Sequence, residues 1–134
     1  MSARKMTELT VRVESEVGEL AKILGLSSQA GANVLAFCGY EHGGGDTGAT
    51  VMLVVDKPDK AQDLLKREGY SVTANPVVAV GGAAGRGMGA KVAERIAKGG
   101  INILYSYASS TGTGQSIAIF RVLKPDQALK ALKA

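Results

Sequence analysis

Hydrophobic and polar residues along the chain follow two periods, one of two residues and one close to 3.6. Apolar and polar residues alternate over 9–14, which predicts a half-buried strand. Apolar residues then recur at helical spacing over 20–27, and Gly31 suits the end of that helix. The predicted elements that follow are a strand over 33–40, a loop over 42–48, a strand over 50–55, a helix over 60–67 started by Pro58, and a strand from Tyr70.

The second half of the chain repeats the first. Residues 18–23 align with 87–92, and 31–34 align with 100–103, both at an offset of 69. Lys57-Pro58-Asp59 aligns with Lys124-Pro125-Asp126 at an offset of 67. The offset changes once, and a hairpin loop is where a deletion is best tolerated. We therefore interpret the chain as a tandem duplication.

The repeat predicts the fold class. The second copy reads as a strand over 77–80, a glycine loop, a helix over 90–98, strands over 101–108 and 116–123, and a helix over 126–131. The order β-α-β-β-α-β predicts an α+β fold of two ferredoxin-like modules, residues 1–75 and 76–134, each an antiparallel sheet with helices on one face.

The second module is expected to lack its last strand, because residue 134 corresponds to residue 67 of the first repeat. The edge of strand 77–80 should then pair with a strand from the other repeat or from a second subunit. Strand 51–55 is apolar on both faces, which predicts that its second face is also covered. Together these features predict a homodimer.

Composition limits the class of protein. Apolar residues make up 46% and charged residues 21%, as in globular domains. The net charge is +4, but Lys and Arg are scattered and often adjoin acids, which favours a solvated surface over a nucleic-acid site. A single cysteine, Cys38, excludes an intrachain disulfide and a thiolate zinc site. Residues 1–10 have no apolar signal core, and polar residues interrupt the charge-free run 99–120, so we expect a cytoplasmic protein without a membrane helix.

Two segments of each repeat resemble the ACT domain. The first is the turn before the first helix, Ser15-Glu16-Val17-Gly18-Glu19-Leu20, which is similar to Asp-x-Pro-Gly-x-Leu. The second is Gly-x-Asn-Ile/Val, found as Gly31-Ala32-Asn33-Val34 and Gly100-Ile101-Asn102-Ile103. The resemblance runs from about residue 8 to 134 and is strongest to small stand-alone tandem ACT proteins. In the second repeat the turn keeps only Gly87, and Ala84 offers no polar side chain there.

The resemblance implies a non-catalytic regulatory module that binds an amino acid or a similar small carboxylate at module or subunit interfaces. It also implies an enzyme, regulated by the module, as a partner. The ligand would contact the turn and the asparagine. The candidate binding residues are Ser15, Glu16, Val17, Gly18, Asn33, Val34, Arg86, Gly87, Met88, Asn102 and Ile103.

Elementary chemistry supports a carboxylate at these turns. Helix N-termini carry free N–H groups and partial positive charge. Arg86 has the fork geometry for a carboxylate, and the glycines of 81–89 allow close backbone approach. Each residue type also has a structural role: Ser15 as an N-cap, the two asparagines as turn-closing residues, and Glu16 and Glu19 as complements of the helix dipole or contacts for an ammonium group.

Other residues indicate no further chemistry. His42 with Glu41 and Asp46 is poor metal spacing and is expected in an exposed loop. Cys38 is expected to be a small buried residue. Tyr105 and Tyr107 alternate on a strand, which favours packing. We find no catalytic set, metal cluster or cofactor motif.

Two alternatives stay open. The loop 81–89 between a strand and a helix is compatible with a nucleotide, although it lacks the ordered G-x-G-x-x-G and Walker patterns. A protein interaction module without a small ligand is the other. RNA binding is disfavoured, because the central strand 50–55 has no aromatic residue.

Overall fold

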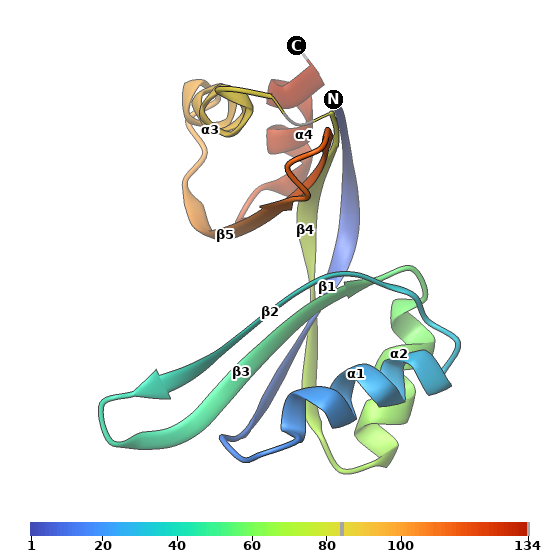
Figure 1. Ribbon diagram of the computed structural model, residues 1–134. Coiled ribbons are helices and arrows are strands. Elements are labelled where there is room, and N and C mark those ends of the chain that lie inside the picture. Colours follow the sequence, from blue (N-terminus) through green and yellow to red (C-terminus); the bar gives the residue numbers. More distant parts are fainter. Residues whose placement is uncertain (84, 134) are drawn as a thin grey trace. The chain divides into compact units, whose positions relative to one another are not determined.

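The computed structural model describes residues 1–83 and 85–133. Its elements alternate as the duplication predicts (Figure 1). In chain order they are β1 (Ser2–Glu14), α1 (Glu19–Gln29), β2 (Val34–Gly43), β3 (Asp46–Val55), α2 (Pro58–Arg67), β4 (Ser71–Ala83), α3 (Met88–Lys98), β5 (Ile103–Ser110), β6 (Gln115–Val122) and α4 (Pro125–Lys133). Among the described residues, no helix is long and apolar enough to cross a membrane.

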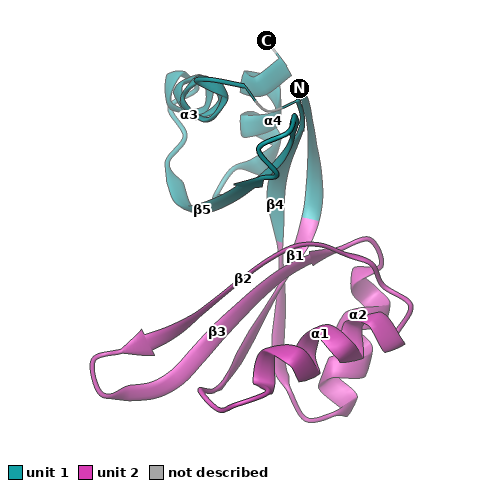
Figure 2. Cartoon of the chain, in the orientation of Figure 1, with its two compact units in different colours: residues 1–6, 76–134 teal, residues 7–75 magenta. Residues whose placement is uncertain are grey.

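The chain forms two compact units (Figure 2). Unit 2 contains the first repeat, Thr7–Asn75. Unit 1 contains the second repeat, Pro76–Ala134, together with Met1–Met6. The hydrogen-bonded strand order is β2-β3-β1-β4-β6-β5, and β1 and β4 each have 13 residues, which they divide between the units. This confirms the α+β, ferredoxin-like tandem expected from the sequence.

Residues 2–6 of β1 occupy the place of the strand that the second repeat lacks. They belong to unit 1, where β1 is the neighbour of β4. Ala3 packs against the core of unit 1, and Lys5 Nζ lies 3.1 Å from Asp126 Oδ1 on α4. The partner strand therefore comes from the start of the same chain, and the edge of β4 needs no second subunit.

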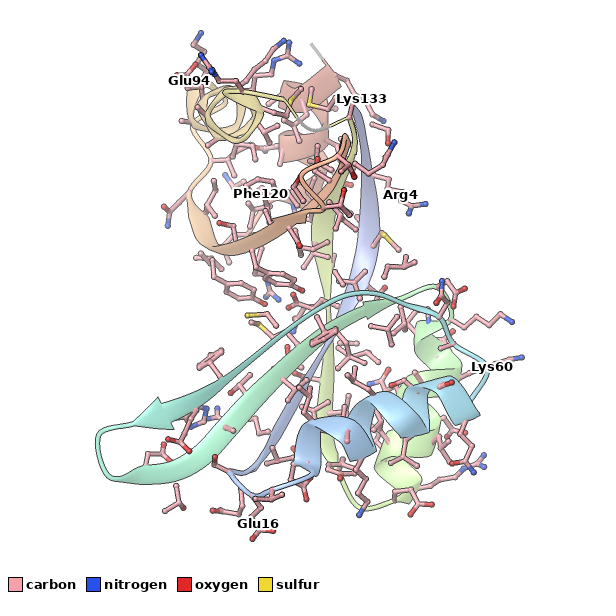
Figure 3. All side chains as sticks on the ribbon, in the orientation of Figure 1. Arg4, Glu16, Lys60, Glu94, Phe120 and Lys133 are labelled. Carbon is pink, nitrogen blue, oxygen red and sulfur yellow. The ribbon has the colours of Figure 1, made fainter. Side chains whose placement is uncertain are left out.

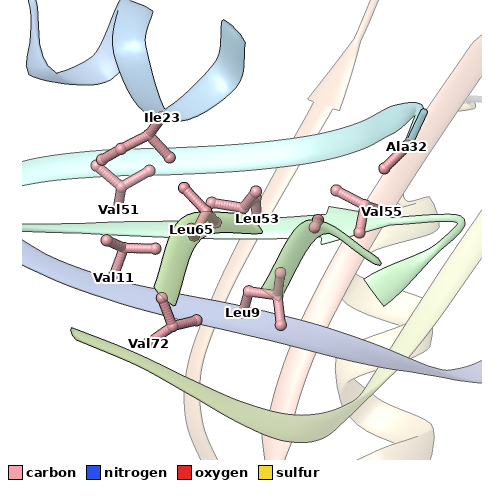
Figure 4. Close-up of a cluster of buried hydrophobic side chains, with 10 residues drawn as sticks. Leu9, Val11, Ile23, Ala32, Val51, Leu53, Val55, Leu65 and Val72 are labelled. Atoms are coloured by element: carbon pink, nitrogen blue, oxygen red, sulfur yellow. The ribbon is translucent and has the colours of Figure 1, made fainter. Parts of the chain in front are cut away.

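Unit 2 is built around β3, which pairs antiparallel with β1 and β2. α1 and α2 cover one face of these strands (Figure 1). Alternate residues of β1 and β3 meet the helices in a buried core made of Leu9, Val11, Ile23, Ala32, Val51, Leu53, Val55, Ala61, Leu65 and Val72 (Figure 4). On the opposite face, Met52 and Val54 are 6% and 0% exposed, so the apolar second face of β3 is buried as well.

Unit 1 repeats this design with β6 in the central position. β6 pairs antiparallel with β4 and β5. Its core contains Val78, Val80, Val92, Ile96, Ile101, Phe120, Val122, Ala128 and Leu132. Arg95 of α3 also donates to the Leu132 carbonyl at 3.1 Å, which ties α3 to the end of α4.

The β2–β3 hairpin differs from the predicted loop over 42–48. β2 continues to Gly43 and β3 begins at Asp46. Gly43, Gly44 and Gly45 have φ angles of 73°, 63° and 86°, a left-handed conformation that suits glycine. Consecutive glycines thus make a tight turn, and the expected loop consists mostly of strand.

Candidate functional site

A cavity of about 310 Å³ opens in unit 1, between the first turn of α3 and the β5–β6 hairpin. Its wall is mostly apolar and includes Val80, Val92 and Phe120 from the core. Ser109, Ser110 and Ser116 add hydroxyl groups on the hairpin side. Gly85, Met88 and Gly89 form the wall at the helix end.

Unit 2 has a cavity of about 330 Å³ at the corresponding place, between the first turn of α1 and the β2–β3 hairpin. Four carboxylate residues line it, together with polar and aromatic groups. The carboxylate residues are Glu14, Glu16, Glu19 and Glu41.

The two cavities are equivalent under the repeat. At the offset of 69, the four glutamates correspond to Ala83, Gly85, Met88 and Ser110, and all four of these line the cavity of unit 1. The two repeats share the position of the cavity but not its charge. The unit 1 cavity has no Asp or Glu among its described lining residues.

α1 and α3 each have a glycine as the N-cap residue, and both helices leave backbone amide hydrogens available at this end. The N-caps are Gly18 and Gly87, with φ angles of 90° and 78°, and neither caps through a side chain. The Met88 N–H donates to the Gly85 carbonyl at 3.2 Å, whereas the next residue, Gly89, lines the cavity and its amide has no partner among the described hydrogen bonds. Free amides and the helix dipole make this end of α3 suited to an anion.

Ser15 is not the N-cap that its residue type allowed. Its hydroxyl donates to Glu41 Oε2, and its N–H donates to the Thr47 carbonyl at 2.8 Å. These two bonds join the turn to the β2–β3 hairpin, so the turn and the hairpin form one wall of the unit 2 cavity. Glu16 also lines this cavity, and Val17 stands fully exposed beside it.

The asparagines lie at the other end of each unit. The Asn33 N–H donates to Asp56 Oδ1 at 2.7 Å, and its carbonyl accepts from the Asp56 N–H at 3.1 Å. Thr47, which holds Ser15, is nine residues from Asp56, or roughly 30 Å at about 3.3 Å per residue. One small ligand cannot touch Ser15 and Asn33 within one unit.

The second repeat shows the same separation. Ile103, next to Asn102, pairs with Val122 at one end of β6, while Ala83, before the turn, pairs with Gln115 at the other. Val34 and Ile103 pack against the hydrophobic cores. Of the remaining candidates, Arg86 is exposed at the turn and Met88 lines the cavity. Ala84 lies outside the described residues.

His42 is part of a strand rather than an exposed loop. Its Nδ1 lies 3.1 Å from Asp46 Oδ2 and its Nε2 lies 2.7 Å from Thr50 Oγ1, so the ring clamps the glycine turn of the hairpin. A hydrogen bond from the Gly48 N–H, followed by His42, lowers the pKa of the Asp46 carboxyl. No group of metal-ligating side chains occurs among the described residues. Cys38 is only half-buried, and Tyr105 and Tyr107 are half-buried on β5.

Tyr70 closes the helix side of unit 2. Its hydroxyl donates to Glu19 Oε2 at 2.8 Å, and Lys22 Nζ lies 5.5 Å from the centre of its ring. Burial, followed by the neighbouring Glu19 carboxylate, raises the pKa of Tyr70 to about 12. Through this hydrogen bond Tyr70 anchors Glu19, a carboxylate of the cavity wall.

Sequence reasoning missed the hairpin side of both cavities. It identified the turns, but not Phe37, Tyr40, Ser109, Ser110 or Ser116. The repeat alignment held a usable signal, because the offset that relates the two turns also relates the two hairpins. The alignment does not predict that each hairpin lies next to the N-terminus of the helix.

Comparison with known proteins places this geometry in a family. A family model for the ACT domain pair matches residues 4–133. Because the match covers nearly the whole chain, the protein belongs to the ACT domain pair family. No curated protein sequence matches the chain.

Solved structures share the fold at low sequence identity. Protein BT0572 from Bacteroides thetaiotaomicron has a TM-score of 0.81 and 23% identity over 98% of this chain and 88% of that chain. The regulatory subunit of aspartate kinase from Thermus thermophilus, in a ligand-free form, has a TM-score of 0.68 and 16% identity over 99% and 96%. The regulatory subunit of aspartate kinase from Thermus flavus has a TM-score of 0.66 and 17% identity over 98% of this chain and 94% of that chain. The likeness extends over both units of the chain.

Proposed function

We propose that the protein is a non-catalytic regulatory module that binds an amino acid, or a similar small carboxylate, in the cavity of unit 1. The observation that carries this proposal is the cavity itself: an apolar space that ends at the free first turn of α3. Ligand sites in proteins are typically concave and apolar, with a few convergent polar groups.

The geometry suggests how such a ligand is held. Its carboxylate would accept hydrogen bonds from the Gly89 and Ala90 amides at the N-terminus of α3. Its apolar part would lie against Val80, Val92 and Phe120. Gly89 has no side chain to obstruct the approach, since a Cβ placed there meets no atom within 4 Å.

The unit 2 cavity is less suited to a carboxylate. Its four glutamates would repel a second negative charge, and like charges in a confined site raise the cost of binding. We therefore assign the small ligand to unit 1.

The regulatory role is supported by the family and by the structural neighbours, two of which are regulatory subunits of aspartate kinase. We propose that this chain also acts on an enzyme, as a homodimer in the cytoplasm. Its single cysteine is consistent with a reducing compartment.

A thermal-shift screen of the common amino acids tests the proposal. A ligand that binds only the folded protein raises the melting temperature with concentration. We expect at least one amino acid with an apolar side chain to do so. If none changes the melting temperature, the proposed ligand class is wrong.

A matched pair of variants locates the site. Ser116→Leu places a large side chain in the unit 1 cavity, and Ala49→Leu does the same at the repeat-equivalent position in unit 2. We expect Ser116→Leu to abolish the ligand-induced shift and Ala49→Leu to preserve it. The reverse pattern would move the ligand to unit 2.

A further inference from the structure

The charges of the chain divide unequally between the two units. Unit 1 has ten Lys and Arg against two Asp and Glu, a net charge of +8, while unit 2 has six against ten, a net charge of −4. The modest overall charge of +4 does not reveal this difference, and Lys and Arg look scattered along the sequence. A compact unit with such an excess of cations attracts polyanions.

The cations of unit 1 gather on the outer side of its two helices. Lys91 and Lys98 flank Glu94 on one face of α3, because residues three and four positions apart share a face of a helix. Glu94 lies on the side of α3 that points away from the sheet of unit 1 (Figure 3). α4 packs against α3 and adds Lys130 and Lys133. The four lysines are exposed, and we call this surface the lysine face.

The positive charge of the lysine face is not neutralised by neighbouring acids. None of its four lysines takes part in an ion pair within the part of the chain that the structure describes. The acids of α3 and α4 are Glu94 and Asp126, and Asp126 Oδ1 already lies 3.1 Å from Lys5 Nζ. Arg95 adds a further positive charge where it joins α3 to the end of α4. The face therefore presents mostly cations to an approaching molecule.

The first repeat shows that the fold does not require this charge. Lys98 corresponds to Gln29 at the offset of 69, and Lys130 corresponds to Asp63 at the offset of 67. Asp63 Oδ2 in turn lies 2.7 Å from Arg67 Nη2. The helices of unit 2 thus pack on an equivalent core with a mixed surface, and the lysine face is a property of unit 1 alone.

The residues between the lysines indicate which polyanion fits the face. The other exposed positions of α3 and α4, apart from the two acids, are small or polar: Gly89, Ala90, Ala97 and Gln127. Partner proteins and membrane surfaces are bound through bulky apolar or aromatic anchors, which these positions do not supply. Neither helix contains an aromatic residue on which the bases of a single strand could stack. The phosphate backbone of a duplex needs only cations.

We propose that the lysine face binds the phosphate backbone of a double-stranded nucleic acid without reading its sequence. Lys91 and Lys98 are two turns apart on α3, about 10 Å at 1.5 Å per residue. Duplex DNA carries one charge per roughly 1.7 Å of its axis, so several phosphates fall within the span of the face. Gln127 is the one exposed side chain of α3 and α4 that carries an amide for a base edge, so the contacts go to the backbone. This binding activity is separate from the small-ligand cavity, and neither depends on the other.

Fluorescence anisotropy tests the proposal with the full chain and a short labelled DNA duplex of arbitrary sequence. The titration is repeated between about 50 and 200 mM salt, because binding to phosphates releases counterions and weakens as salt rises. Each phosphate contact contributes about −0.9 to the slope of log K against log salt concentration. If each of the four lysines contacts one phosphate, the slope should be about −4.

A matched pair of double variants locates the contact. Lys98→Gln with Lys130→Gln removes two charges from the lysine face. Lys60→Gln with Lys66→Gln removes two charges from exposed positions of α2 in unit 2. The first pair should weaken duplex binding at least about tenfold at 0.1 M salt and make the slope less negative by about 2. The second pair should leave both the affinity and the slope close to those of the wild type.

The outcomes decide both the surface and its occupant. A wild-type chain that binds no duplex at the lowest salt overturns the proposal, and so does an equal loss in the two double variants, since net charge alone would then explain binding. A duplex RNA is the second probe: binding to either duplex supports the proposal, and the two affinities decide between DNA and RNA. Polyglutamate and phosphatidylserine vesicles are the comparison probes. If either binds more tightly than both duplexes through the same lysines, the occupant is an acidic protein or a membrane and the proposal is wrong.

Discussion

Ala3 is half-buried against the core of unit 1, at the start of the strand that completes this unit. Replacing it with Asp tests whether residues 2–6 are a structural part of the second repeat. A carboxylate at this position loses part of its hydration without gaining a partner, which costs about 1–3 kcal/mol. At about 0.05–0.15 kcal/mol per residue, a unit of some 65 residues has roughly 3–10 kcal/mol of stability, so the loss is a substantial fraction.

The control is Ser2→Asp, which adds the same charge at the exposed neighbouring position. Urea unfolding measures the loss in the free energy of unfolding, and amide hydrogen exchange shows which elements are destabilised. Ala3→Asp should accelerate exchange in β4, β6 and α3, and leave β3 of unit 2 nearly unchanged. Equal effects of the two variants, or exchange that rises only in unit 2, would refute the role of this strand.

Three further predictions address the core, the pH response and the distant asparagines. Leu65→Ala, at a fully buried position, should lower the free energy of unfolding by about 2–5 kcal/mol in a urea titration, and a loss far below this would mean that the core is not packed as described. The pKa of Tyr70 is raised to about 12 from its ordinary value of 10.0, so between these pH values the folded chain keeps a proton that the unfolded chain has lost. Stability should therefore fall as pH rises through this window, and Tyr70→Phe should flatten that slope. Asn33→Ala and Asn102→Ala should leave ligand affinity unchanged in calorimetry, whereas a loss of about 1–3 kcal/mol would place the ligand at the asparagine end.

The duplication made most of the fold predictable. Alternation over 9–14 and helical spacing over 20–27 gave the right elements, and the repeat transferred them to the second half. The first residues were the main omission, because Arg4 and Lys5 make them look like a polar tail. Their strand pairs with the edge of β4, a contact between residues far apart in the sequence that local patterns do not reveal.

The candidate site was predictable only in part. The turns follow from local sequence, and Gly18 and Gly87 do begin the helices. Asn33 was grouped with the turn through the resemblance to the ACT domain, and the helix between them sets the two apart within one unit. The cavity and the division of charge between the units depend on which residues the fold brings together. Neither can be predicted from the order of the residues along the chain.

The measurement that tests the central claim most directly is a titration of labelled protein with the stabilising amino acid, followed by amide chemical shifts in NMR. Binding at the N-terminus of α3 predicts the largest changes at the Gly89 and Ala90 amides, with smaller ones at Ser109 and Ser116 on the hairpin. Shifts confined to Asn33 and Asn102, or to the turn at Glu16, would contradict a carboxylate site in unit 1.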